Sequence, residues 1–164
     1  MGRMYTVAWA GTVTNAGADV DLLEVLPADD KIVRLRRMLL SQTSEVGDAA
    51  EECLRITIYR LRATVTGGSS GTAAADGSTL NAVNADDTAA GFAAEYNNTT
   101  VATTSGNSNA LAELGWNERA SPYEMFWSYE DAPKVKQGEA LVVRQQTTAA
   151  DDYSGCFTFW LEED

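Results

Sequence analysis

The sequence predicts an all-β protein, an antiparallel β-sandwich with about eight strands, and three observations support this. Apolar and polar residues alternate along most of the chain, as they do in strands that bury one face. Clusters of Gly, Asn, Asp and Ser separate the alternating runs, which is typical of turns. The pattern lacks the crossover helices that parallel strands require. We therefore expect one sandwich domain over residues 1–164, jelly-roll-like, with one short helix.

Three strands are expected in the first part of the chain. The first carries aromatic and branched residues at alternate positions, and the second is a short apolar run. The second ends at Pro27, which cannot donate to a ladder. The third also fits an amphipathic helix, but we favour a strand with Arg37 at a bulge or an edge. These strands are predicted at residues 5–9, 20–26 and 31–40.

The middle of the chain is expected to contain the helix, one strand and the longest loop. Residues 44–52 hold good helix formers with acids in the first turn, and Asp48 is a potential cap. Residues 54–65 alternate between apolar and polar side chains, which predicts a strand. The Gly-, Ala- and Asn-rich residues 66–88 predict a long loop, and loops longer than about 12–15 residues are often functional.

The C-terminal third alternates most clearly. Small and apolar residues share one face over 110–116, and aromatic residues share one face over 123–129. A turn at Gln137-Gly138 then leads into a strand at 139–145, and a strand at 156–163 ends the sequence.

The absence of histidine excludes several classes of site. Ser-His and Cys-His nucleophilic catalysis and every His-containing zinc site are ruled out. We expect Cys53 and Cys156 to be free, partly buried and unreactive thiols in a protein made in the cytoplasm. The sequence therefore predicts a protein that is not an enzyme and uses no cofactor.

Acidic residues recur in pairs, and clustered loop carboxylates can bind calcium through six to eight oxygen ligands. No segment has the EF-hand pattern, and Asp is common in turns because it bonds its own backbone. Two carboxylates would also suffice for glycoside hydrolysis, but nothing marks which acids would pair. We expect turn residues and no metal site at Asp19, Asp21, Asp29-Asp30, Asp86-Asp87 and Asp151-Asp152.

The charge is distributed unevenly. The chain has 12 basic and 24 acidic residues, a net charge of −12. Residues 1–62 hold eight basic and nine acidic residues, a net of −1, so the remaining four basic and fifteen acidic residues give −11. This charge argues against nucleic acid as a partner, because phosphate binding needs clustered Lys and Arg. No apolar run reaches the length that spans a membrane.

Basic residues in two of the predicted strands are candidates for a partner interface. The strands could pair into a basic stripe that docks an acidic partner, or the same residues could pair with acids of this chain. We leave both interpretations open. The interface candidates are Arg34, Arg36, Arg37, Arg55, Arg60 and Arg62.

Four short blocks of the sequence resemble small structural proteins of tailed-bacteriophage virions. The resemblance lies in the sequences Pro-Ala-Asp-Asp-Lys and Leu-Ser-Gln-Thr-Ser-Glu, an Ala-Gly-Phe-Ala-Ala-Glu-Tyr-Asn-Asn-Thr-Thr stretch, a Gly-Glu-Ala-Leu-Val-Val strand and the acidic final strand. In this chain, the blocks fall at residues 27–31 together with 40–52, at 90–100, at 138–143 and at 154–163.

The resemblance implies a capsid decoration (cement) protein that binds the outside of the head and stabilises contacts between major capsid subunits. It further implies a homotrimer on the virion surface, made in the host cytoplasm, with no catalytic residues. The alternative is a tail, baseplate or fibre domain that binds carbohydrate of the host surface. Under that alternative, the sugar-platform candidates are Trp116, Trp127 and Tyr129.

Overall fold

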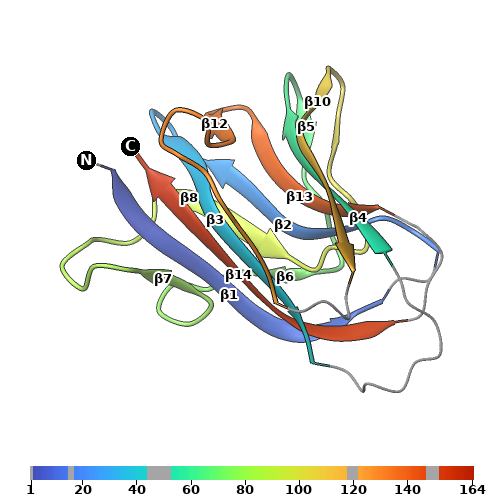
Figure 1. Ribbon diagram of the computed structural model, residues 1–164. Coiled ribbons are helices and arrows are strands. Elements are labelled where there is room, and N and C mark those ends of the chain that lie inside the picture. Colours follow the sequence, from blue (N-terminus) through green and yellow to red (C-terminus); the bar gives the residue numbers. More distant parts are fainter. Residues whose placement is uncertain (1, 15–16, 44–52, 118–121, 147–151) are drawn as a thin grey trace.

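The computed structural model describes residues 2–14, 17–43, 53–117, 122–146 and 152–164. All named secondary-structure elements within these residues are β-strands. Two antiparallel sheets face each other as a sandwich, and the two chain ends lie side by side (Figure 1). The all-β antiparallel sandwich is thus confirmed. The prediction of about eight strands was too low, because the described residues form 14 strands and the additional ones are only two to five residues long. The helix predicted at residues 44–52 lies outside the described residues.

The first sheet, sheet A, has six strands in the order β11-β3-β14-β1-β7, with β12 also paired to β3. Long strands occupy its centre, and short strands occupy its margins. Its members are β1 (Arg3–Val13), β3 (Ile32–Gln42), β7 (Leu80–Ala82), β11 (Tyr123–Phe126), β12 (Lys134–Lys136) and β14 (Tyr153–Glu163).

The second sheet, sheet B, also has six strands, in the order β10-β4-β13-β2-β8-β6. A separate two-stranded ribbon joins β5 (Val65–Thr66) and β9 (Thr103–Thr104). The strands of sheet B are β2 (Val20–Pro27), β4 (Cys53–Leu61), β6 (Thr72–Ala73), β8 (Phe92–Tyr96), β10 (Ser108–Asn117) and β13 (Ala140–Gln146).

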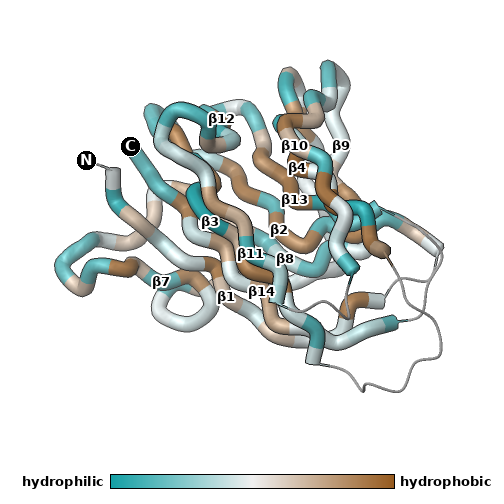
Figure 2. The backbone as a smooth tube through the Cα atoms, viewed as in Figure 1, coloured by the Kyte–Doolittle hydropathy of each residue, from teal (hydrophilic) through white to brown (hydrophobic). Residues whose placement is uncertain are grey.

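The core lies between the inner faces of the two sheets. Alternate residues of the long strands point inward, so each strand buries one row of side chains. Trp9 stacks on Phe157 with ring centroids 4.2 Å apart, and Trp116 meets Tyr153 edge to face. Figure 2 shows apolar residues along β2, β13 and β4, which form one wall of this core.

The strand predicted at residues 31–40 is β3, and it contains a β-bulge one residue away from Arg37, where a bulge or an edge was predicted. Its register with β14 jumps from Arg37–Trp160 to Leu35–Leu161, so Arg36 is the extra residue of a bulge. The strand is interior, since β14 lies on one side and β11 and β12 lie on the other.

The predicted loop at residues 66–88 proves to be partly sheet. Thr66 ends β5, β6 pairs with β8, and β7 pairs with β1. Leu80 of β7 is buried and packs in the main core. The sequence of this segment has no long alternating pattern, because its strands are only two or three residues long. They form by pairing with the neighbouring strands β8 and β1.

A small third layer covers part of the outer face of sheet B. Ala102, next to β9, packs with Leu61, Ala140 and Val142 of the sheet, and Val65 of β5 packs against them. Asp21 and Asn98 exchange backbone hydrogen bonds of 3.0 and 2.9 Å, which attach the covering segment to β2. This layer buries polar residues on the outer side of β2. On the outer face of sheet A, Ala8, Ala10 and Thr12 are exposed, whereas Arg34 and Glu162 are buried.

Candidate functional site

The part of the outer face of sheet A between the rows of Thr6 and Thr12 of β1, here called the open face, carries little charge. Cross-strand register places its residues in rows across β3, β14 and β1. The adjoining row, Arg34–Glu162–Met4, lies outside this part and is charged, since Glu162 pairs with Arg36 and Arg34 pairs with Asp164. Within the open face, the only ionised side chains in the rows are Arg37 and Glu124, which pair with each other. Apart from that pair, the rows consist of Thr6, Ala8, Ala10, Thr12, Leu39, Ser41, Asn81, Phe126, Ser154, Cys156, Thr158 and Trp160.

One row of the open face carries two aromatic rings. Phe126, Arg37 and Trp160 are direct cross-strand neighbours on β11, β3 and β14. Phe126 is 68% exposed, and the Arg37 guanidinium lies 4.2 Å from the centroid of the Trp160 ring. A guanidinium in this position is attracted to the face of the ring, so Arg37 and Trp160 form a cation–π pair across the two strands.

The three residues predicted as a sugar platform do not form one. Trp116 is only 1% exposed and lies in the core, and Trp127 packs against that core. Tyr129 is exposed, but the Arg34 guanidinium lies 4.2 Å from its ring centroid. Phe126 and Trp160 were not predicted as surface candidates, because a single apolar residue on the polar side of a strand gives no periodic signal.

Five of the six candidate arginines form ion pairs within this chain. Three of them lie on β3, in sheet A, and the others lie on or beside β4, in sheet B, so the two stretches do not pair into one stripe. Arg60 makes no ion pair with any described residue. The pairs are Arg34–Asp164, Arg36–Glu162, Arg37–Glu124, Arg55–Glu113 and Arg62–Glu139.

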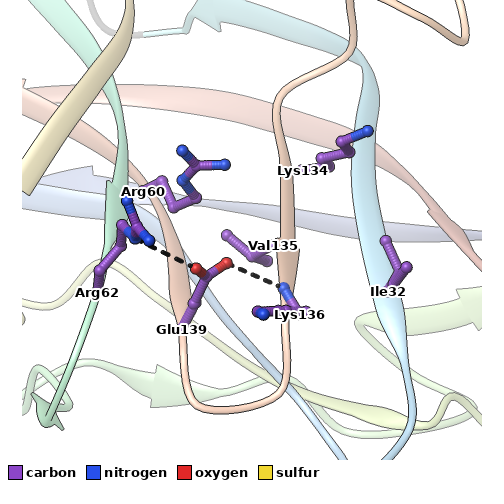
Figure 3. A pocket seen from close by; sticks show the side chains of 7 residues that line it. All are labelled: Ile32, Arg60, Arg62, Lys134, Val135, Lys136 and Glu139. Carbon is purple, nitrogen blue, oxygen red and sulfur yellow. Dashed lines mark hydrogen bonds and ion pairs between the residues drawn. The ribbon is translucent and has the colours of Figure 1, made fainter.

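Arg60 and Arg62 instead contribute to a basic pocket between the end of β4, the strand β12 and the turn before β13 (Figure 3). The cavity has a volume of about 250 Å³. Ile32 and Val135 supply apolar surface. The lining residues are Ile32, Arg60, Arg62, Lys134, Val135, Lys136 and Glu139.

The basic pocket concentrates positive charge on an acidic protein. It holds four of the 12 basic residues and one acid. Glu139 accepts a hydrogen bond from the Lys136 backbone N at 3.3 Å and lies 3.6 Å from Arg62 Nε. Within the described residues, Lys134 and Lys136, like Arg60, form no ion pair. The arrangement can therefore accept a further anion.

Asp21 and Arg144 form a buried pair beneath the third layer. Arg144 donates to both carboxylate oxygens of Asp21, at 2.6 and 3.2 Å, and Ala102 N donates to Oδ2 at 2.7 Å. Burial raises the pKa of Asp21, while the hydrogen bonds and charge of Arg144 oppose that shift. The pair fastens the covering segment to the sheet.

Glu24, on the same outer side of β2, has no cationic partner among the described residues. Its Oε2 accepts hydrogen bonds from Gly68 N at 2.8 Å and Asn98 Nδ2 at 3.0 Å. Its direct cross-strand neighbour is another acid, Glu95. Burial, and then the charges of Asp21 and Glu95, raise the pKa of Glu24. A Cβ at Gly68 would lie 2.8 Å from the Thr100 carbonyl oxygen, so glycine permits this close approach.

Other predicted sites can be located as well. No group of three or more Cys, Asp or Glu side chains in the described ranges is placed to hold a metal ion. Cys53 and Cys156 are unpaired, but both are exposed rather than partly buried, because each points to the outer side of its strand. No described helix is long and apolar enough to cross a membrane.

Comparison with known proteins gives no family. No family model matches the chain, and no curated protein matches it. Among solved structures, the chain has a likeness to one titled "Structure of infectious bursal disease virus Gx strain", with 14% identity and a TM-score of 0.20. That match covers 99% of this chain and 42% of the other, so this chain spans less than half of the chain that it matches. A TM-score this low gives the likeness no weight for fold or function.

Proposed function

We propose that this protein is a bacteriophage capsid decoration protein that binds the outside of the head and stabilises contacts between major capsid subunits. The observation that carries the proposal is the open face. Charged residues are depleted at the centres of protein interfaces, because burying an unpaired charge is costly. On a chain of net charge −12, a surface whose rows hold one self-contained ion pair, bordered by the paired charges of Arg36 and Glu162, is the surface best suited to dock on another protein.

We further infer that the sandwich is a jelly roll. With β1, β2, β3, β4, β10, β11, β13 and β14 numbered one to eight in chain order, sheet A reads 1-8-3-6 and sheet B reads 2-7-4-5. This order is that of two interleaved Greek keys, an architecture found in viral capsid domains and in lectins. Because a fold does not imply a function, the order supports the proposal only together with the open face.

In this proposal, the partner is the major capsid protein and the decorating unit is a homotrimer on the virion surface. Such binding is non-covalent and involves no catalysed reaction. A protein that binds the assembled shell and not its separated subunits stabilises the shell by mass action.

The proposal is tested by adding a charge to the open face. Ala10, which is exposed on β1, is changed to Glu, and binding to purified heads is measured by co-sedimentation. We expect the affinity to fall about tenfold or more, since the new carboxylate must be buried without a partner. Ala110→Glu, at an exposed position of β10 in sheet B, is the matched control and should bind normally. Equal binding by both variants would refute docking through the open face.

One observation favours a second candidate function, the binding of host-surface carbohydrate by a tail, baseplate or fibre domain. Phe126, Arg37 and Trp160 lie in one row, with Glu124 in the next row, and ligand sites combine aromatic surface with a few polar groups. A glycan array probed with the protein and with Phe126→Ala separates the two functions. Specific glycan binding that this variant loses would favour the carbohydrate function, and an array without signal would favour decoration.

A further inference from the structure

We infer that the basic pocket is a binding site for an acidic side chain of a partner protein, with Arg60 as the principal anchor. This site lies outside the open face and adds a second, charge-specific contact. Binding there is a property of the isolated protein, so it can be measured whether or not the protein decorates a capsid.

Arg60 is the residue best placed to receive a carboxylate. It is half-buried, its Nε is buried without a hydrogen-bond partner, and it has no ion pair within the described residues. A guanidinium binds a carboxylate through two parallel hydrogen bonds, which gives both energy and orientation. Because Arg60 lines the pocket without an ion pair in the described residues, its guanidinium can pair with an incoming carboxylate.

The neighbours of Arg60 make the pocket selective for negative charge. Arg62 and Lys136 lie on either side of Glu139, which neutralises only one of the four cations. Figure 3 shows Lys134 on the other side of β12, pointing toward β3, where it adds positive charge to the rim. Such rim charges mainly raise the rate of association, and salt screens them.

The size and the apolar lining of the pocket favour a carboxylate side chain over a free inorganic anion. A cavity of about 250 Å³ is several times the volume that one water occupies in the liquid, about 30 Å³. Ile32, which is 38% exposed, offers apolar surface to the methylene groups of a Glu or Asp side chain, and the buried Val135 lies beneath it in the lining. Inorganic phosphate would leave that surface without a partner.

The test is a titration of the full chain, followed by amide chemical shifts in NMR at low salt. The probe is the capped peptide Gly-Glu-Gly-Glu-Gly-Glu-Gly, and the comparison ligands are the same peptide with Gln for Glu and inorganic phosphate. We expect the Glu peptide to shift amides of residues 60–62 and 134–139 and the Gln peptide to leave them unchanged. Phosphate that binds as tightly as the Glu peptide would overturn the assignment to acidic side chains.

Variants separate the pocket from general charge effects. Arg60→Gln should weaken binding of the Glu peptide about twofold to fivefold, the range expected for one solvent-accessible ion pair. Lys136→Gln, at an exposed position of an edge strand, should also weaken it without disturbing the fold. Arg55→Gln is the matched control, because it removes the same charge from β4 outside the pocket. Equal weakening by the control, or no weakening by either pocket variant, would show that the pocket is not the site.

Discussion

At the level of single residues, the two buried acids of β2 show how this acidic chain tolerates charge in its interior. Asp21 is fully buried and is matched by the guanidinium of Arg144, in a bidentate geometry. A buried ion pair adds little net stability, but removing one partner leaves an uncompensated charge. The pair is therefore a strong constraint on how residues 97–104 lie over sheet B.

Changing Arg144 to Met should destabilise the protein by about 3–5 kcal/mol, because Asp21 would remain buried without its cation. The free energy of unfolding is measured with urea. The double variant Arg144→Met with Asp21→Asn should recover part of the loss, since no unpaired charge is then left. A loss below about 1 kcal/mol in the single variant would contradict the buried pair.

The buried Glu24 should make the free energy of unfolding depend on pH. Its pKa is raised in the folded protein, so its contribution is favourable when it is protonated and is lost as the pH rises through the folded pKa. Glu24→Gln mimics the protonated form and should gain stability relative to the parent between pH 4.5 and pH 7.5. Urea midpoints of both proteins at the two pH values measure this gain, and Glu130→Gln, at an exposed turn, is the control. A gain that does not grow with pH would contradict the raised pKa.

At the level of strands, the sequence predicted the long elements because each buries a row of alternating apolar side chains. The strand at residues 5–9 is the centre of β1, and the apolar run at 20–26 is β2. The short strands β6, β7 and β12 were not predicted, since two or three residues carry no periodic pattern, and the five-residue strand β8 was also missed. Ala110 was predicted to share the face of Trp116, but a bulge between Ala110 and Ala112 leaves Ala110 exposed.

Two aromatic residues on different strands should respond to mutation in opposite ways. Trp116→Ala should cost about 3–5 kcal/mol, because Trp116 is buried against Tyr153 and Phe157. Phe126→Ala should change the free energy of unfolding by less than about 0.5 kcal/mol, since its ring is largely exposed. Urea unfolding of both variants measures the difference. Similar losses in the two variants would contradict the assignment of one ring to the core and the other to the surface.

At the level of the whole molecule, both candidate surfaces depend on contacts that sequence periodicity does not encode. The basic pocket joins the end of β4 to β12, which are about 70 residues apart and belong to different sheets. Arg60 and Arg62 were recognised as candidates because they stand in a strongly patterned strand. Lys134 and Lys136 were missed because nothing in the local sequence shows that β12 lies beside Arg60 and Arg62.

The open face was likewise not predicted as a unit. Its small polar residues on β1, β3 and β14 are the ordinary outward residues of three separate strands. Only the strand order brings them together into one nearly uncharged surface, and that order is set by long-range pairing. The decoration proposal rests on this assembled surface.

The location of the protein on the virion is measured by immunogold labelling of particles from the phage lysate that contains it, viewed by negative-stain microscopy. If the protein binds the outside of the capsid, gold will be spread over the heads. Gold confined to the tails, or absent from the particles, would contradict the decoration function.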